Sequence, residues 1–71
     1  MRLKWEERSD RLVAYVPGTP FRCTIYEDKQ FMAEISARNT AGYIASSSFA
    51  CIWTAKNWCR NTLNRWVKAM Q

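Results

Sequence analysis

The C-terminal third of the chain most restricts its fold, because no Gly or Pro interrupts it between residues 46 and 70. Apolar residues recur there at helical intervals, and at about 100° per residue they share a stripe roughly 80° wide. The stripe consists of Ile52, Ala55, Cys59, Leu63, Trp66 and Met70. Serines at residues 46–48 offer hydroxyl groups that can accept hydrogen bonds from first-turn amides. The pattern predicts an amphipathic helix over about residues 48–70.

The first half of the chain has the shorter period that is typical of strands. Alternating or β-prone runs, separated by turn residues, occur at residues 3–7, 12–16, 21–26, 31–36 and 41–45. The third and fourth runs are joined by the polar residues 27–29 and predict a hairpin. The Pro-Gly-Thr-Pro segment at residues 17–20 predicts a loop. The last run is a candidate edge strand.

Strands followed by one long helix predict an α+β fold, with the helix across one face of a small antiparallel sheet. We expect three to four strands within residues 3–45 and the helix at about residues 48–70. A chain of 71 residues suffices for a single small domain, which we place over residues 1–71. Since alternate strand residues share a face, the side chains expected to face the helix are Phe21, Cys23, Ile25, Phe31, Ala33 and Ile35.

The composition argues against catalysis and metal binding. The chain contains no His, which removes the commonest general base and metal ligand. Three Cys without Cys-x-x-Cys spacing do not form a zinc set, and we expect reduced, buried thiols in a cytoplasmic protein. No Gly-rich phosphate loop is present. We therefore expect a protein that is not an enzyme, has no metal or cofactor and does not enter a membrane.

The charge balance is basic, with 11 Lys and Arg against 6 Asp and Glu, a net charge of +5 and a pI near 9.5. Such a balance suits an anionic partner, either nucleic acid or an acidic protein surface. The cations are spread along the chain rather than grouped in runs. A solvated, soluble surface therefore remains the alternative interpretation.

One helix can cover only one face of a sheet, so the other face is a candidate interaction surface. In the central hairpin that face presents Tyr26 and Met32 among polar residues. The mixture is compatible with docking of a partner, with formation of a homodimer or with plain solvent exposure.

The predicted helix offers another candidate surface around Trp53. This residue lies about 120° from the centre of the apolar stripe. Polar and basic residues lie beside it at helical spacing: Lys56, Arg60 and Asn64. Since Trp and Arg are enriched at binding hot spots, this group is the first candidate for partner binding. Alternatively, Trp53 and Trp58 both complete the core.

Several segments together resemble small phage and prophage proteins: Leu3-Lys4-Trp5-Glu6, Phe21-Arg22-Cys23-Thr24-Ile25, Phe31-Met32-Ala33-Glu34-Ile35 and Ala55-Lys56-Asn57-Trp58-Cys59. Such proteins have a Trp-containing first strand, further strands and a closing helix, and small phage inhibitors of this size include anti-CRISPR proteins. The resemblance implies a phage-type accessory protein in the host cytoplasm. Such a protein would bind and modulate or inhibit a host protein or nucleoprotein complex.

The order of sheet then helix is also similar to DNA-binding domains of the AP2 and integrase arm-binding type, which read the major groove with a three-stranded sheet. This resemblance implies contacts from Arg22 and Tyr26 on the uncovered face, where Glu34 would oppose a phosphate. The alternative hypothesis is therefore a small basic nucleic-acid-binding domain. Its candidate contacts are Arg22, Lys56, Arg60, Arg65 and Lys68.

Overall fold

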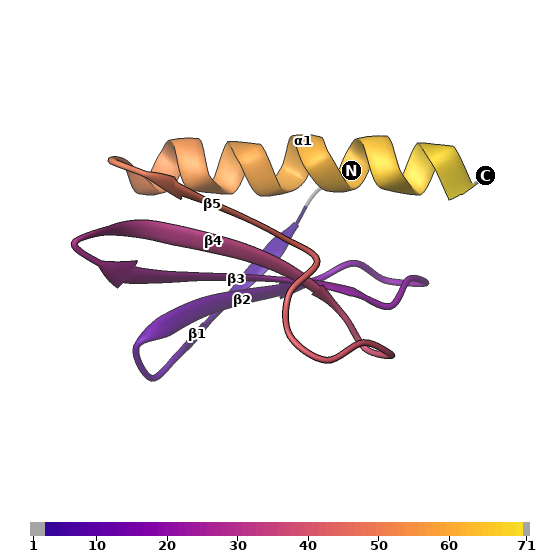
Figure 1. The fold of residues 1–71 in the computed structure, drawn as a ribbon, viewed down its shortest axis with the longest axis horizontal. Helices are drawn as coiled ribbons and strands as arrows, with labels where there is room; N and C mark the ends of the chain where they lie inside the picture. Colours follow the sequence, from indigo (N-terminus) through magenta and orange to yellow (C-terminus); the bar gives the residue numbers. More distant parts are fainter. Residues whose placement is uncertain (1–2, 71) are drawn as a thin grey trace.

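The computed structural model describes residues 3–70, which form one antiparallel sheet and one helix. The strands pair in chain order, and α1 lies along one face of the sheet (Figure 1). The elements are β1 (Lys4–Arg8), β2 (Arg11–Tyr15), β3 (Phe21–Asp28), β4 (Gln30–Ala37), β5 (Ala45–Phe49) and α1 (Ile52–Met70). The predicted α+β class is confirmed, but the sheet has five strands rather than three to four.

The predicted central hairpin is formed by β3 and β4. Their register runs from Phe21 opposite Ala37 to Asp28 opposite Gln30. Lys29 lies between the last pair with a φ of 67°, a left-handed conformation that costs a residue with a Cβ roughly 1–2 kcal/mol. This register brings the side chains predicted to face the helix to one side of the sheet: Phe21, Cys23, Ile25, Phe31, Ala33 and Ile35.

The serines predicted to cap the helix lie in a strand instead. Residues 46–48 form the middle of β5, which runs from Ala45 to Phe49 and pairs with β4. The edge strand predicted at residues 41–45 is therefore displaced: only Ala45 of that run lies in β5, residues 41–44 belong to the loop after β4, and α1 begins at Ile52 rather than near residue 48. Pairing with β5 gives the backbone groups of β4 a second ladder of hydrogen bonds. This ladder stabilises the chain more than one helix-capping hydrogen bond would.

Cys51 takes the capping position that the serines were expected to hold. Its carbonyl oxygen accepts hydrogen bonds from the Ala55 amide at 3.2 Å and from the Thr54 hydroxyl at 2.8 Å. The Cys51 side chain is exposed, whereas Cys23 and Cys59 are buried. The expectation of three buried thiols is therefore wrong for Cys51.

The hydrophobic core lies between α1 and the strands beneath it. Ile25, Ile35 and Leu63 are the largest fully buried side chains. The predicted helix stripe packs against or within this core from residue 52 to residue 66. Met70 departs from it with 61% exposure, because the last turns of α1 extend past the strands (Figure 1).

The helix does not cover the whole sheet. The backbone of α1 runs close to β4, β5 and β3, so β1 and β2 extend the sheet beyond it. We call the helix side of the sheet the covered face and the other side the open face. The register places on the open face Lys4, Glu6, Arg8, Arg11, Val13, Tyr15, Arg22, Thr24, Tyr26, Met32, Glu34 and Ser36. Within residues 3–70, no helix is long and apolar enough to cross a membrane.

Candidate functional site

Two tryptophans of α1 have different surroundings. Trp58 is half-buried against the core, and its ring centre lies 5.9 Å from that of Phe49 on β5. Trp53 is 67% exposed. Core packing therefore explains Trp58 and does not explain Trp53. A large aromatic side chain held in water is typical of a binding hot spot, where a partner covers it.

Lys56 connects Trp53 to a second indole ring on the sheet. Its Nζ atom lies 5.1 Å from the centre of the Trp53 ring and 5.9 Å from the centre of the Trp5 ring. Both distances allow cation–π attraction. Trp5 reaches this position because it pairs with Ala14 on the covered face. We name this surface, two aromatic rings around one cation, the Trp5–Lys56–Trp53 patch.

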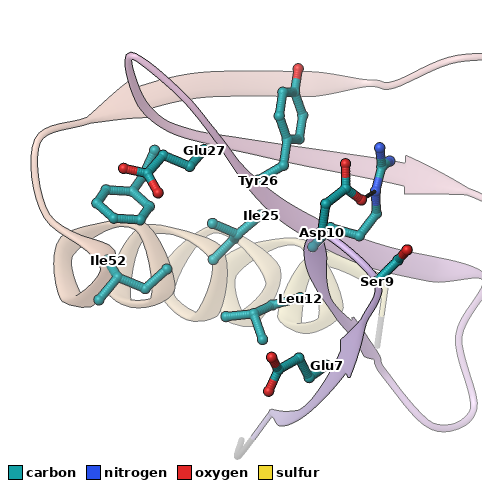
Figure 2. Close-up of a pocket in the computed structure, with 10 residues that line it drawn as sticks. Glu7, Ser9, Asp10, Leu12, Ile25, Tyr26, Glu27 and Ile52 are labelled. Atoms are coloured by element: carbon teal, nitrogen blue, oxygen red, sulfur yellow. Dashed lines mark hydrogen bonds and ion pairs between the residues drawn. The ribbon is translucent and has the colours of Figure 1, made fainter.

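A groove of about 390 Å³ opens where the start of α1 faces the end of the β1–β2 hairpin (Figure 2). Its apolar lining consists of Leu12, Ile25, Phe31 and Ile52. In Figure 2 the aliphatic side chains lie between the carboxylates of Glu7 and Glu27. Among the described residues, neither carboxylate forms an ion pair. We call this feature the acidic-rimmed groove.

The patch and the groove are neighbours because the same elements build both. Trp5 and Glu7 are alternate residues of β1, so both lie on the covered face. Ile52 and Trp53 are consecutive residues at the start of α1. Among the described residues, the α1 backbone stays close to β3, β4 and β5 and not to β1. We treat the patch and the groove together as one candidate docking site.

Four of the predicted partner-binding residues share one side of α1. Trp53, Lys56, Arg60 and Asn64 follow one another at intervals of three and four residues, which places neighbours in contact along a helix. Arg60 is exposed and Asn64 is half-buried. The structure therefore brings this predicted group together, with Trp5 as an additional member.

The other two predicted partner-binding residues, Tyr26 and Met32, lie on the open face of the sheet. The Tyr26 hydroxyl donates a hydrogen bond to Glu34 Oε2 at 3.0 Å. This bond, together with partial burial, raises the pKa of Tyr26. The sheet separates Met32 from α1, whereas Tyr26 also contributes to the lining of the acidic-rimmed groove, next to Ile52.

The candidate nucleic-acid contacts are also divided. Arg22 lies on the open face, whereas the other four residues lie on α1, which contains no acidic residue. On the helix, Arg65 lies about 180° from Lys56 at about 100° per residue. These cations therefore do not form one surface.

Sequence reasoning missed Trp5, Glu7 and Glu27 as site residues. The alternation of β1 contained the signal for the first two, because it places Trp5 and Glu7 on the same face of the strand, where Trp5 is half-buried and Glu7 is exposed. Their common face became clear only with the β1–β2 register, in which Glu7 lies opposite Leu12. Glu27 was placed in a turn, whereas it lies in β3 opposite Phe31.

The chemistry available elsewhere in the described structure is limited. Among residues 3–70, no group of three or more His, Cys, Asp or Glu side chains could hold a metal ion. In the core, a hydrogen bond with Cys59 raises the pKa of the Cys23 thiol, and burial raises it further. The candidate site itself offers aromatic, apolar and charged contacts, which suit recognition of a partner.

Comparisons with protein-family models, with curated proteins and with solved structures found no match to this chain.

Proposed function

We propose that this chain is a non-enzymatic protein that binds a partner protein through the Trp5–Lys56–Trp53 patch and the acidic-rimmed groove. The observation that carries the proposal is the 67% exposure of Trp53, next to a groove with an apolar floor. Covering both removes apolar surface from water, which drives association. A phage-type role, with a host protein or nucleoprotein complex as the partner, stays a prediction.

The charges around the site indicate what kind of surface fits it. Glu7 and Glu27 flank the apolar floor, which suits an apolar side chain with Lys or Arg as neighbours. Lys56 and Arg60 project from a helix that carries no acidic residue, which suits an acidic region of the partner beside that anchor. Complementary charges of this kind contribute to specificity and to the rate of association more than to affinity.

The test compares Trp53→Ala with Met70→Ala. Both side chains are exposed and belong to the same helix, but Met70 lies at its far end. Wild type and both variants are immobilised, and the proteins that they capture from a cell extract are compared. We expect a protein that wild type and Met70→Ala retain and that Trp53→Ala loses, with a dissociation constant raised about 30-fold or more for the purified pair, as for a hot-spot residue.

Thermal unfolding of the variants separates binding from folding. Trp53→Ala should shift the melting temperature by little more than Met70→Ala does, because neither side chain is buried. Equal capture by wild type and Trp53→Ala would refute the proposal. A large loss of stability in Trp53→Ala alone would also refute it, because Trp53 would then belong to the core.

Nucleic-acid binding is the second candidate function, and the four cations of α1 without an acidic residue favour it. Its test is a titration of labelled duplex and single-stranded DNA at about 50 and about 200 mM salt, because phosphate contacts weaken steeply over this range. Loss of affinity in Lys56→Gln and Arg60→Gln at low salt would support this candidate. No binding at the lower salt concentration would exclude it.

A further inference from the structure

Arginines gather on the open face of the sheet, and one of them, Arg11, also lines the acidic-rimmed groove. The register pairs Arg8 of β1 with Arg11 of β2, and it places Arg22 of β3 on the same face. All three line one hollow of about 260 Å³, together with Val13, Tyr15 and Thr24. Among the described residues, none that lines this hollow carries a carboxylate.

A second hollow of about 210 Å³ adjoins the first, because Arg11, Arg22 and Thr24 line both. Ser36 contributes to it from β4, and the loop after β4 closes one side with Thr40 and Tyr43. Hydroxyl groups therefore lie beside the guanidinium groups. We call the two connected spaces the arginine hollow.

The cations of the arginine hollow are incompletely neutralised. Arg8 pairs with Glu6 at 3.0 Å and Arg11 pairs with Asp10 at 3.3 Å. Arg22 donates a hydrogen bond to Ser36 Oγ at 3.2 Å, and it has no carboxylate partner among the described residues.

This concentration of positive charge acts against folding. Like charges directly opposite each other in neighbouring strands, such as Arg8 and Arg11, are destabilising. An anion bound between the strands would offset that repulsion.

We infer that the arginine hollow binds a phosphate group. A guanidinium group presents a planar fork of N–H donors that matches two oxygens of a phosphate, and the hydroxyl groups of Thr24 and Ser36 can contact a further oxygen. A phosphate carries up to two negative charges and more acceptor oxygens than a carboxylate, which suits a site with three guanidinium groups.

Glu34 is the one carboxylate beside the second hollow, and its position directs the anion to the first. Its Oε2 accepts the Tyr26 hydroxyl at 3.0 Å, and it lies on β4, one strand further from Arg8 and Arg11 than Thr24. The phosphate therefore sits over β2 and β3, where Arg11 and Arg22 reach it from two sides.

The experiment is a titration with inorganic phosphate at constant ionic strength, followed by amide chemical shifts, for wild type, Arg22→Gln and Arg65→Gln. Both variants remove one positive charge, but Arg65 lies on α1. We expect saturable shifts at the open face and a dissociation constant about tenfold higher in Arg22→Gln, as for a lost hydrogen bond to a charged group. Arg65→Gln should change it less than about twofold.

The source of the phosphate is resolved by a second titration with a short single-stranded oligonucleotide. If the natural ligand is a nucleic-acid backbone, the oligonucleotide binds more tightly than inorganic phosphate and loses affinity in Arg22→Gln. If the ligand is free phosphate or a phosphomonoester, the oligonucleotide binds no more tightly than inorganic phosphate. A loss in Arg65→Gln alone assigns the oligonucleotide to α1 and counts against the inference.

Arg11→Gln serves as a second variant, because Arg11 also lines both hollows. The inference is overturned if phosphate produces no saturable shift at the open face. It is also overturned if Arg22→Gln and Arg11→Gln both keep the wild-type dissociation constant. Arg22 does not line the acidic-rimmed groove, so the Arg22→Gln result is independent of the proposed docking site, whereas Arg11 lines that groove as well.

Discussion

The two faces of the sheet bury side chains by different means. On the covered face, α1 closes over side chains that are almost completely buried: Cys23, Ile25, Ala33 and Ile35. On the open face, Val13, Thr24 and Ser36 are also buried, although no helix lies above them. Their cover comes from long neighbouring side chains such as Arg11 and Arg22, which line the hollows around them.

This difference indicates that the covered face stabilises the fold and that the open face is available for recognition. Apolar contacts on the covered face remove apolar surface from water in the folded state, so they stabilise the fold. On the open face, the exposed guanidinium group of Arg22 can exchange its hydrogen bond with Ser36 for one with water at little cost. The open face can therefore release its side chains to a ligand without unfolding the sheet.

The largest predicted difference in stability between the two faces is tested with two residues of the same strand. Ile35 lies on the covered face of β4 and is fully buried, whereas Met32 lies on the open face and is half-buried. Ile35→Ala should lower the free energy of unfolding by about 2–5 kcal/mol, because it leaves a cavity under α1. Met32→Ala should lower it by less than about 1 kcal/mol. Denaturant unfolding measures both values.

The Met32→Ala variant also tests whether the open face is covered by a second copy of the chain. An equally large loss in Met32→Ala would contradict the comparison, because the open face would then be buried as deeply as the covered face. Sedimentation of wild type and Met32→Ala over a range of concentrations would show whether a second copy covers that face. A homodimer formed through it remains a prediction from the sequence.

The next effect is a loss of stability at alkaline pH that originates on the covered face. A hydrogen bond with Cys59 and burial raise the pKa of the Cys23 thiol, whereas a Cys in an unfolded chain titrates near about 8.5. Above that pH, the unfolded chain releases a proton that the native chain keeps. The free energy of unfolding should therefore be unaffected by this thiol below about pH 8 and fall above it by up to about 1.4 kcal/mol per pH unit.

Two cysteine variants isolate this contribution in unfolding curves between about pH 7 and pH 10. Cys23→Ala should remove the slope, although it lowers stability at every pH. Cys51→Ala should retain it, because the Cys51 side chain is exposed. The same slope in all three proteins would mean that other groups cause the alkaline loss.

A third effect, of opposite sign, belongs to α1. The Thr62 hydroxyl is buried and has no hydrogen-bond partner among the residues that the structure describes. Thr62→Val should therefore raise the free energy of unfolding by about 1 kcal/mol, because it removes an unsatisfied polar group at nearly constant shape. In Thr54 the hydroxyl donates to the Cys51 carbonyl at 2.8 Å. Thr54→Val should lower stability by about 0.5 kcal/mol or more, and equal signs for the pair would contradict this account.

Much of the covered face could be predicted from the sequence. The helical period from Ile52 to Trp66 and the alternation in β3 and β4 predicted the core correctly, because burial on one side imposes a regular spacing. Predictions from local sequence patterns were wrong where the pairing of strands decides the structure. Residues 46–48 read as a helix cap by composition, yet the free edge of β4 made them a strand.

The candidate site was predicted in part for the same reason. Trp53, Lys56, Arg60 and Asn64 were found because one helix carries them all. Trp5 joins them from the other end of the chain, and only the sheet register brings it near. Arg8 and Arg11 were placed in a turn, so their convergence with Arg22 could not be seen before the strands were paired.

The smallest effect is expected on the open face, from Tyr26→Phe. This change removes the hydrogen bond from the Tyr26 hydroxyl to Glu34, which is 3.0 Å long and joins two half-buried side chains. Because water can reach both partly exposed groups, the free energy of unfolding should change by less than about 0.5 kcal/mol.

Glu34→Gln provides the matched change at the other end of this hydrogen bond, since an amide oxygen still accepts from Tyr26. Denaturant unfolding of both variants at pH 7 measures the effect, and a phosphate titration of Glu34→Gln should show equal or tighter binding, because a negative charge beside Arg22 is gone. A loss above about 1.5 kcal/mol in Tyr26→Phe would show that this hydrogen bond is shielded from water. The open face would then hold the fold as the covered face does, and its side chains would not be free to rearrange around an anion.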